Sequence, residues 1–185
     1  MIRKIRTKKE SRDAIISLNL NTVPEIFIEK HETEKMQKFF DDYKEDLYIL
    51  RDADRSSSRY EYIKSYEECI EKAQLFSGKV ILAVSINTYK EKILLGAMEI
   101  GSDNNIKICA TENKSLDHRT MYGGAEYNFE SDICDKRFSK ITGFDDVYGY
   151  LIRNNLIDIT VEFTLYDRAV GTKNEKIVIN EIRNY

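Results

Sequence analysis

The chain is poor in the residues that interrupt regular structure. Its 185 residues include a single proline, Pro24, and only eight glycines. Proline and glycine mark most turns, so a loop-rich fold or an all-β fold with many tight turns would need more of them. Apolar residues make up 42% of the chain and charged residues 33%. This balance is typical of a globular protein with a packed core rather than of a disordered chain.

Length and charge narrow the class further. The chain fits one domain of roughly 100–200 residues. We expect a single α+β domain over residues 1–185, with mixed or mainly antiparallel sheets in two small lobes, 1–77 and 78–185. Lysine and arginine number 29 against 32 for aspartate and glutamate, a net charge of −3. Nucleic acid is disfavoured as a partner, because the acidic total leaves no overall basic field.

The sequence argues against metal centres built on cysteine or histidine. Cys69, Cys109 and Cys134 lie far apart without CxxC spacing, and the two histidines have no nearby cysteine or histidine. We therefore expect reduced thiols in a cytoplasmic protein without a secretory signal. The longest apolar stretch, around Val80–Ile86, is far shorter than the roughly 18 residues of a membrane-spanning helix, so no membrane association is expected.

Apolar periodicity predicts the order of helices and strands. Residues 79–89 and 93–100 are expected to be two strands joined by a tight turn. Gly78 is expected to cap the C-terminus of a helix, and Thr142 to begin the last helix. The long segment 111–136 is expected to be a functional lid or a partly disordered insertion. The helices are expected over 7–18, 36–43, 63–78 and 142–155, the further strands over 25–30, 47–51, 106–110, 156–166 and 176–185, and a polar loop over 52–60.

The last two strands are expected to place two carboxylates side by side. If their connection folds symmetrically about Gly171 and Thr172, Glu162 lies directly opposite Glu181, with Arg183 on the same face opposite Thr160. Opposed carboxylates have Cβ atoms about 5 Å apart and repel each other unless a cation, a shared proton or an arginine neutralises them.

Two interpretations of this acid pair stay open. In the first, the carboxylates hold magnesium together with a substrate phosphate, because hard oxygen ligands suit that ion. In the second, the face is solvated and Arg183 makes an ordinary surface ion pair with Glu162, worth less than about 1 kcal/mol. A register change of one residue would move every side chain to the other face.

Basic residues near the N-terminus suggest an anion site. Lys8 and Lys9 fall in the first turn of the first helix, where the helix dipole disfavours cations and a bound phosphate would remove the conflict. Arg51, which directly follows an apolar strand, is a further candidate for a phosphate contact. The alternative is that these side chains are simply solvated.

In this order, the motifs resemble those of ATP-grasp domains, particularly the N-terminal nucleotide-binding domain of phosphoenolpyruvate synthase, pyruvate phosphate dikinase and rifampicin phosphotransferase. The family has a lysine before a helix, a strand of the form VP-x-F, an arginine ending a strand before a serine-rich loop, a hydrophobic strand pair over the adenine, an acidic residue in a strand, and a terminal strand of the form acid or amide, x, Arg. The matching residues are Lys8 or Lys9, Val23–Phe27, Ile49–Arg51 with the loop to Ser58, 80–87 with 93–100, Val161–Phe163 and Glu181–Arg183.

The resemblance implies a role for each matched residue. Lys8 or Lys9 and Arg51 would contact the phosphates of ATP, as cofactor-binding residues. Glu162 and Glu181 would hold magnesium. The implied cofactors are therefore ATP and Mg, and the implied small-molecule partner is a nucleotide.

The catalytic role that the resemblance implies belongs to the terminal arginine. By the resemblance, Arg183 would stabilise the transferring phosphoryl group.

The chain departs from the family pattern in three ways. The double-acid motif after the arginine–serine loop is not evident, Asn184 replaces a proline, and 185 residues leave no room for a phosphohistidine domain.

Two functions follow from these observations. The first is an ATP- and magnesium-dependent enzyme, a ligase or phosphotransferase. The alternative is a catalytically silent interaction or regulatory module of the same fold that works with a protein partner, which the missing motifs and the small size favour.

Overall fold

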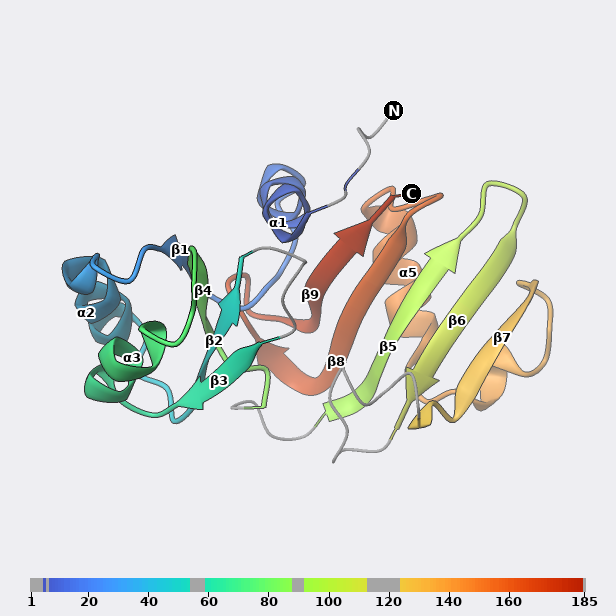
Figure 1. Cartoon of the computed structure of the whole chain (residues 1–185). Helices are drawn as coiled ribbons and strands as arrows, with labels where there is room; N and C mark the ends of the chain where they lie inside the picture. The colour runs from blue at the N-terminus through green and yellow to red at the C-terminus, as the bar shows by residue number, and fades with distance from the viewer. Residues whose placement is uncertain (1–4, 6, 54–58, 88–91, 113–123, 185) are drawn as a thin grey trace. The chain divides into compact units, whose positions relative to one another are not determined.

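A computed structural model describes residues 5, 7–53, 59–87, 92–112 and 124–184, and Figure 1 shows the fold. No helix among these residues is long and apolar enough to cross a membrane. The helices are α1 (Lys8–Ser17), α2 (Thr33–Asp42), α3 (Tyr66–Ala73), the 3-10 turn η1 (Phe138–Lys140) and α5 (Phe144–Arg153). The strands are β1 (Glu25–Ile28), β2 (Tyr48–Asp52), β3 (Tyr60–Ile63), β4 (Val80–Val84), β5 (Lys92–Ile100), β6 (Asn105–Thr111), β7 (Tyr127–Asp132), β8 (Thr160–Val170) and β9 (Glu175–Arg183).

The chain forms two compact units, each built on its own sheet. The smaller unit comprises Thr7–Lys9 and Val23–Tyr89, and the larger unit comprises Met1–Arg6, Glu10–Thr22 and Lys90–Tyr185. All pairings between named strands are antiparallel. The predicted α+β class with mainly antiparallel sheets is therefore confirmed.

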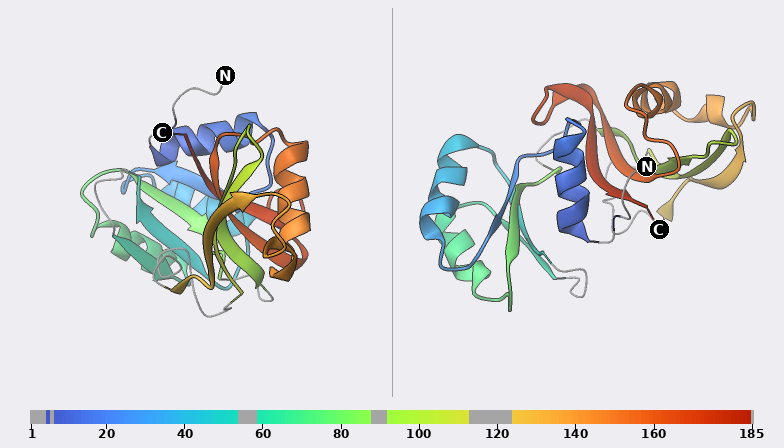
Figure 2. Two further views of the ribbon diagram at one scale, coloured as in Figure 1. Left: turned by 90° about the vertical axis from the view of Figure 1, so that its right-hand side faces the viewer. Right: turned by 90° about the horizontal axis from the view of Figure 1, so that it is seen from above.

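The smaller unit is a four-stranded sheet in the order β1-β4-β2-β3, with α2 and α3 covering one face (Figure 2). Alternation along the strands sends one set of side chains into the core beneath these helices. That core is formed by Ile28, Met36, Phe39, Tyr48, Leu50, Ile63, Cys69, Ala73, Phe76, Val80, Leu82 and Val84.

The opposite face of this sheet, its second face, mixes apolar and polar side chains. Residues directly opposed in register share a face. The register gives two rows across this face. The first consists of Glu25, Ala83, Ile49 and Tyr62, and the second of Phe27, Ile81, Arg51 and Tyr60.

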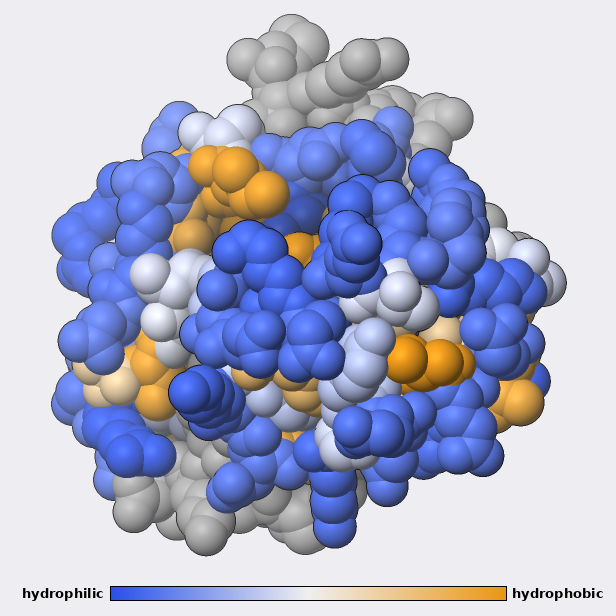
Figure 3. Space-filling model, turned by 90° about the vertical axis from the view of Figure 1, so that its left-hand side faces the viewer, coloured by the Kyte–Doolittle hydropathy of each residue, from blue (hydrophilic) through white to orange (hydrophobic). Residues whose placement is uncertain are grey.

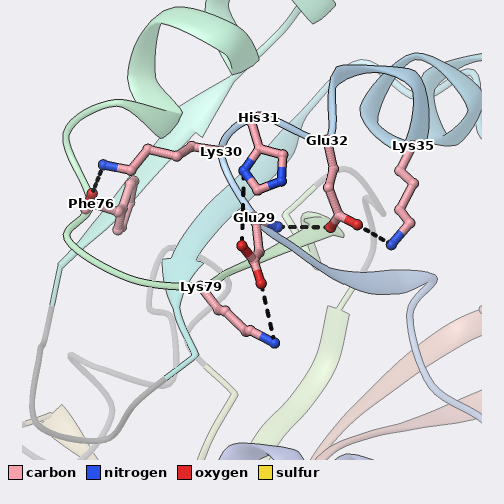
Figure 4. Close-up of polar contacts among 7 residues, drawn as sticks. All are labelled: Glu29, Lys30, His31, Glu32, Lys35, Phe76 and Lys79. Atoms are coloured by element: carbon pink, nitrogen blue, oxygen red, sulfur yellow. Dashed lines mark hydrogen bonds and ion pairs between the residues drawn. The ribbon is translucent and has the colours of Figure 1, made fainter.

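Polar contacts hold the connection between β1 and α2 (Figure 4). The Glu29 backbone N–H donates to a carboxylate oxygen of Glu32, at 2.9 Å. Lys30 Nζ donates to the Phe76 carbonyl oxygen at 3.1 Å, and Lys79 Nζ lies 3.4 Å from Glu29 Oε1.

The surface over α2 and α3 is mostly hydrophilic, with hydrophobic side chains in separate patches (Figure 3). This side of the smaller unit therefore has the character of a solvated surface.

The larger unit is a five-stranded sheet in the order β7-β6-β5-β8-β9, with α5 packed on one face (Figure 1). Helix α1 lies against the edge strand β9, where the Ile182 N–H donates to Ser11 Oγ at 2.9 Å. The core of this unit includes Ile15, Leu20, Leu94, Met98, Ile106, Ile108, Phe144, Val147, Leu151, Val161, Phe163, Leu165, Ile177, Ile179 and Ile182.

The side chain of Asn21 holds the β8–β9 hairpin. Its Nδ2 donates to the carbonyl oxygens of Val170 at 2.9 Å and Ile177 at 2.8 Å, and its Oδ1 accepts from the Lys173 N–H at 2.7 Å. Asn21 is fully buried. Gly171 has a φ of +79°, and a Cβ there would lie 2.7 Å from Asn21 Oδ1. The turn therefore needs glycine both for its backbone conformation and for the close approach of the amide.

The structure corrects four of the predicted elements. Strands β4 and β5 belong to different sheets, so the hairpin expected from 79–100 is wrong. Residues 60–63 form strand β3 instead of loop and helix, because they pair with β2. Helix α3 ends at Ala73 with Gln74 as its C-cap, well before Gly78. The last helix is capped by Gly143 in the left-handed conformation instead of Thr142.

The segment expected to be one long loop, 111–136, contains strand β7 at its C-terminal end. Its residues alternate between partly buried and exposed, and only Tyr127 and Phe129 pack against the core, so the periodic signal is weak. The interpretations of 113–123 and of 54–58 lie outside the described residues.

Replacing Asn21 with alanine is expected to destabilise the larger unit. The substitution leaves buried carbonyl and N–H groups of the hairpin without partners, at a cost of about 1–3 kcal/mol for each such group. We expect the free energy of unfolding, measured by urea denaturation, to fall by about 3 kcal/mol. Asn128→Ala, at an exposed position of β7, is the control and should change it by less than about 0.5 kcal/mol. Equal stability of the two variants would contradict the role of Asn21.

Glu112 should make stability depend on pH. Its Oε1 accepts from the Thr142 N–H at 3.0 Å and from Tyr127 Oη at 2.9 Å. These hydrogen bonds lower the pKa of Glu112 below its usual 4.5, and the bond from the Thr142 N–H has the largest effect. A lowered pKa adds stability that is present above pH 4.5 and lost as the pH falls through the folded pKa. Glu112→Gln should therefore lower the melting temperature at pH 7 and have little effect near pH 3. An equal loss at both pH values would contradict this assignment.

Candidate functional site

The second face of the five-stranded sheet, away from α5, carries the predicted acid pair. Glu162 on β8 is directly opposite Glu181 on β9, and Thr160 is opposite Arg183. The row continues through Ala97 on β5. The predicted register is therefore confirmed at these positions.

The hairpin reaches this register through two irregularities of opposite sense. Between the pairs Val170–Glu175 and Leu165–Ile177, the register moves five residues along β8 but only two along β9. Between the pairs Phe163–Ile179 and Glu162–Glu181, it moves one residue along β8 and two along β9. The second irregularity is a β-bulge that adds Asn180 to β9. The symmetric turn expected from the sequence is thus too simple, although the register that it gives at Glu162 is correct.

Arg183 contacts both carboxylates. One terminal nitrogen of its guanidinium lies 2.8 Å from Glu162 Oε1, and its Nε donates to Glu181 Oε1 at 2.9 Å. The Glu162 and Glu181 side chains are 9% and 12% exposed, and that of Arg183 is 29% exposed. At this depth the ion pairs are shielded from water, so they differ from the solvated surface contact that the sequence left open.

Polar side chains surround this triad on the same face. Thr160 Oγ1 donates to Glu99 Oε2 at 2.7 Å, in the row that contains Arg183. Asn180 Nδ2 donates to Thr164 Oγ1 at 2.9 Å. Thr164 is fully buried although it lies on the polar side of β8. These bonds fix the side chains next to the acid pair.

In the smaller unit, Arg51 lies on the second face of the sheet, at β2. A terminal nitrogen of its guanidinium lies 2.7 Å from Glu25 Oε2, across strand β4. The Glu25 side chain is only 6% exposed. Arg51 Nε is buried, and no acceptor for it lies among the residues that the structure describes. A carboxylate therefore orients the guanidinium and leaves one of its N–H groups for a further acceptor.

The two candidate lysines differ in their surroundings. Lys8 Nζ donates to the backbone carbonyl oxygen of Asp52 at 3.1 Å, so its ammonium group lies beside the end of β2, next in sequence to Arg51. Lys9 is exposed. The structure thus brings Lys8 and the Arg51 strand together, as the phosphate hypothesis requires, and leaves Lys9 at the surface.

Sequence reasoning missed the partner of Arg51, and it gave the pairing of Arg183 with Glu162 as one of two interpretations. Glu25 belongs to the Val23–Phe27 motif but was not considered as a charged residue. The sequence feature that could have identified Glu25 is an acidic residue at the start of a strand, followed by apolar residues. For Arg183, the contact with Glu181 was the one not considered. The spacing of two between these residues predicts it, because residues i and i+2 of a strand share a face.

The residues on this face do not fit a magnesium ion well. Among the described residues, no group of three or more histidine, cysteine, aspartate or glutamate side chains could hold a metal ion. The two carboxylates are correctly opposed, but Arg183 binds one oxygen of each. The Mg²⁺ assignment to Glu162 and Glu181 therefore stays a prediction.

No model of a known protein family matches the chain, and no curated protein matches its sequence. Solved structures do match its fold. D-alanyl-alanine synthetase A from Vibrio cholerae matches with a TM-score of 0.51 and 15% identity, over 96% of this chain and 55% of that one. N5-carboxyaminoimidazole synthetase from Staphylococcus aureus matches with a TM-score of 0.56 and 15% identity, over 97% and 44%.

The ADP complex of purK, N5-carboxyaminoimidazole ribonucleotide synthetase, matches with a TM-score of 0.53 and 14% identity, over 98% of this chain and 46% of that one. The chain spans about half the length of the synthetases it matches. These proteins are ATP-grasp ligases. The expected ATP-grasp-like fold is therefore confirmed, whereas the closer resemblance to phosphoenolpyruvate synthase and pyruvate phosphate dikinase stays a prediction.

Proposed function

We propose that the chain is a nucleotide-binding protein of the ATP-grasp type, which binds ATP and is a ligase or phosphotransferase. The fold supports this proposal, since one of the matching structures is an ADP complex. The observation that carries the proposal is the hydrogen bonding of the Arg51 guanidinium. Its guanidinium is held in place by Glu25 and has a buried Nε–H for which the described residues provide no acceptor. A phosphate oxygen is the kind of acceptor that such an N–H group prefers.

The surroundings of Arg51 suit the two ends of a nucleotide. Ile49, Ile81 and Ala83 form an apolar strip on the same face of the sheet, which suits a purine ring. Lys8 brings a second cation to the end of β2, which suits the phosphates. Lys9, in the same helical turn, is a secondary candidate for a phosphate contact.

The larger unit would act on the phosphate that is transferred. Arg183 would stabilise charge that develops on this group, and Glu162 and Glu181 would fix the orientation of its guanidinium. In a ligase or a phosphotransferase the chain's own task is therefore to orient the nucleotide and to neutralise its phosphates.

A second candidate is an interaction module that has the fold without the chemistry. The observation that favours it is that both candidate arginines already contact carboxylates of their own chain, Arg51 with Glu25 and Arg183 with Glu162 and Glu181. In this candidate the ion pairs are structural, and the protein works through a protein partner.

Calorimetric titration with ATP distinguishes the two candidates. If the protein binds ATP, Arg51→Ala should raise the dissociation constant by about tenfold or more, because a charge-assisted hydrogen bond contributes roughly 1.5–3 kcal/mol. Arg168→Ala, at an exposed position near the hairpin turn, is the control and should leave the dissociation constant unchanged. Absence of heat with the wild-type protein at millimolar ATP would contradict nucleotide binding and leave the module in its place.

Glu25→Gln tests how Arg51 is used. The amide can still accept a hydrogen bond from the guanidinium, but it no longer competes with phosphate for the positive charge. We expect this variant to bind ATP as tightly as the wild type or more tightly. A loss as large as that of Arg51→Ala would contradict competition between Glu25 and phosphate, and a melting curve of the same variant would show whether unfolding is the cause.

A further inference from the structure

The acid pair on the five-stranded sheet already has a cation beside it. Glu162 and Glu181 are directly opposed on neighbouring strands, an arrangement that is repulsive without a compensating charge. Arg183 lies in the adjacent row of the same face and contacts one oxygen of each, at 2.8 and 2.9 Å. One guanidinium therefore contacts both carboxylates.

We propose that Arg183 supplies, from within the chain, the positive charge that this acid pair would otherwise draw from a divalent metal ion, so that the pair binds no magnesium in the native protein. The inference concerns the metal alone and does not require that the protein bind ATP.

Coordination geometry supports this assignment. Mg²⁺ requires near-ideal octahedral oxygen ligands at 2.0–2.1 Å. Here Oε1 of Glu162 and Oε1 of Glu181 are both engaged by the guanidinium. An ion that used these oxygens would lie within a few ångströms of a fixed positive charge, where the repulsion in a poorly hydrated site is large. Metal and arginine therefore compete for the same place.

The charge balance supports it as well. The three side chains by themselves carry a net charge of −1, and adding Mg²⁺ would bring this sum to +1 in a place that is mostly shielded from water. Glu99, another acid on the same face, accepts a hydrogen bond from Thr160 and belongs to the row of Arg183. Thr160 on β8 lies between Glu99 and Arg183 in that row, and no group of three acids that could hold a metal ion occurs among the described residues.

The arginine gives the acid pair a property that a metal site lacks. A guanidinium is always protonated and cannot dissociate, so its positive charge stays beside the pair at any concentration of magnesium or chelator. If the proposed nucleotide binding holds, the positive charge that meets the phosphates comes from Arg183 and the other basic side chains, and binding to this face should persist in EDTA. This last consequence rests on the proposed function.

Titration with Mn²⁺, followed by the EPR signal of the free ion, tests the inference directly. The wild-type protein should leave Mn²⁺ free up to millimolar concentrations. Arg183→Met removes the competing charge while keeping much of the length of the side chain, and should bind Mn²⁺ at least about tenfold more tightly than the wild type. The double variant Arg183→Met with Glu181→Gln should lose that gain, and Arg168→Met, an arginine of the same hairpin, should behave as the wild type does.

Melting curves test the inference even if Arg183→Met is less stable than the wild type. Removing Arg183 leaves two carboxylates uncompensated, so Arg183→Met should melt at a lower temperature than the wild type. Millimolar Mn²⁺ should restore part of the loss in this variant and should shift neither the wild type nor the double variant, because only a ligand of the folded state stabilises it. A variant that folds only with the metal would support the inference in the same way.

Two results would overturn the inference. The first is binding of Mn²⁺ by the wild-type protein that disappears in Glu181→Gln, which would place the metal on the acid pair beside Arg183. The second is a folded Arg183→Met variant that neither binds Mn²⁺ nor gains stability from it. Failure of the proposed function is separate, since a protein that binds no ATP would still give a clear answer in the manganese titration.

Discussion

The carboxamide of Asn21 is the contact on which the geometry of the larger unit depends. It accepts from the N–H of Lys173 in the turn and donates to carbonyl oxygens of both strands of the hairpin, at Val170 and Ile177. A buried amide whose partners all belong to one hairpin defines the register of that hairpin, because a slip of one residue would leave several buried groups without partners. The same slip would exchange the two faces of β9 and carry Glu181 away from Glu162.

The two sheets share one principle of construction. Each has a face covered by helices, where apolar side chains form the core, and a second face that carries the charged residues predicted to act on a ligand. On these second faces the charges lie among apolar or fully buried neighbours, such as Ile81 beside Arg51 and Thr164 next to Glu162 along β8. Charges in such surroundings need compensation close by. Glu25 and Arg183 provide it, so the ion pairs follow from the burial that also makes these faces suitable for a ligand.

Local sequence signals were sufficient for much of the fold and for the acid pair. The alternation in β8 predicted which side chains enter the core, and the symmetric hairpin predicted that Glu162 faces Glu181. The signals failed where the outcome depends on distant residues. Strands β4 and β5 follow each other closely in sequence, but they pair with different neighbours in different sheets, which periodicity does not encode. Asn21 and Glu25 were missed because their partners lie far away in the sequence.

The resemblance and the structure lead to different views of the same arginine. Motif order assigns Arg183 to the transferring phosphoryl group, whereas its contacts assign it to Glu162 and Glu181. The two roles are compatible, because a guanidinium has five N–H donors and the two carboxylates engage only part of them. Arg51 shows the same division, with one terminal nitrogen on Glu25 and the Nε–H directed elsewhere. An arginine held by a buried carboxylate loses less side-chain entropy when it binds an anion, because its position is already fixed. The ion pairs that favour a structural module are therefore the same contacts that would prepare this fold to bind phosphate.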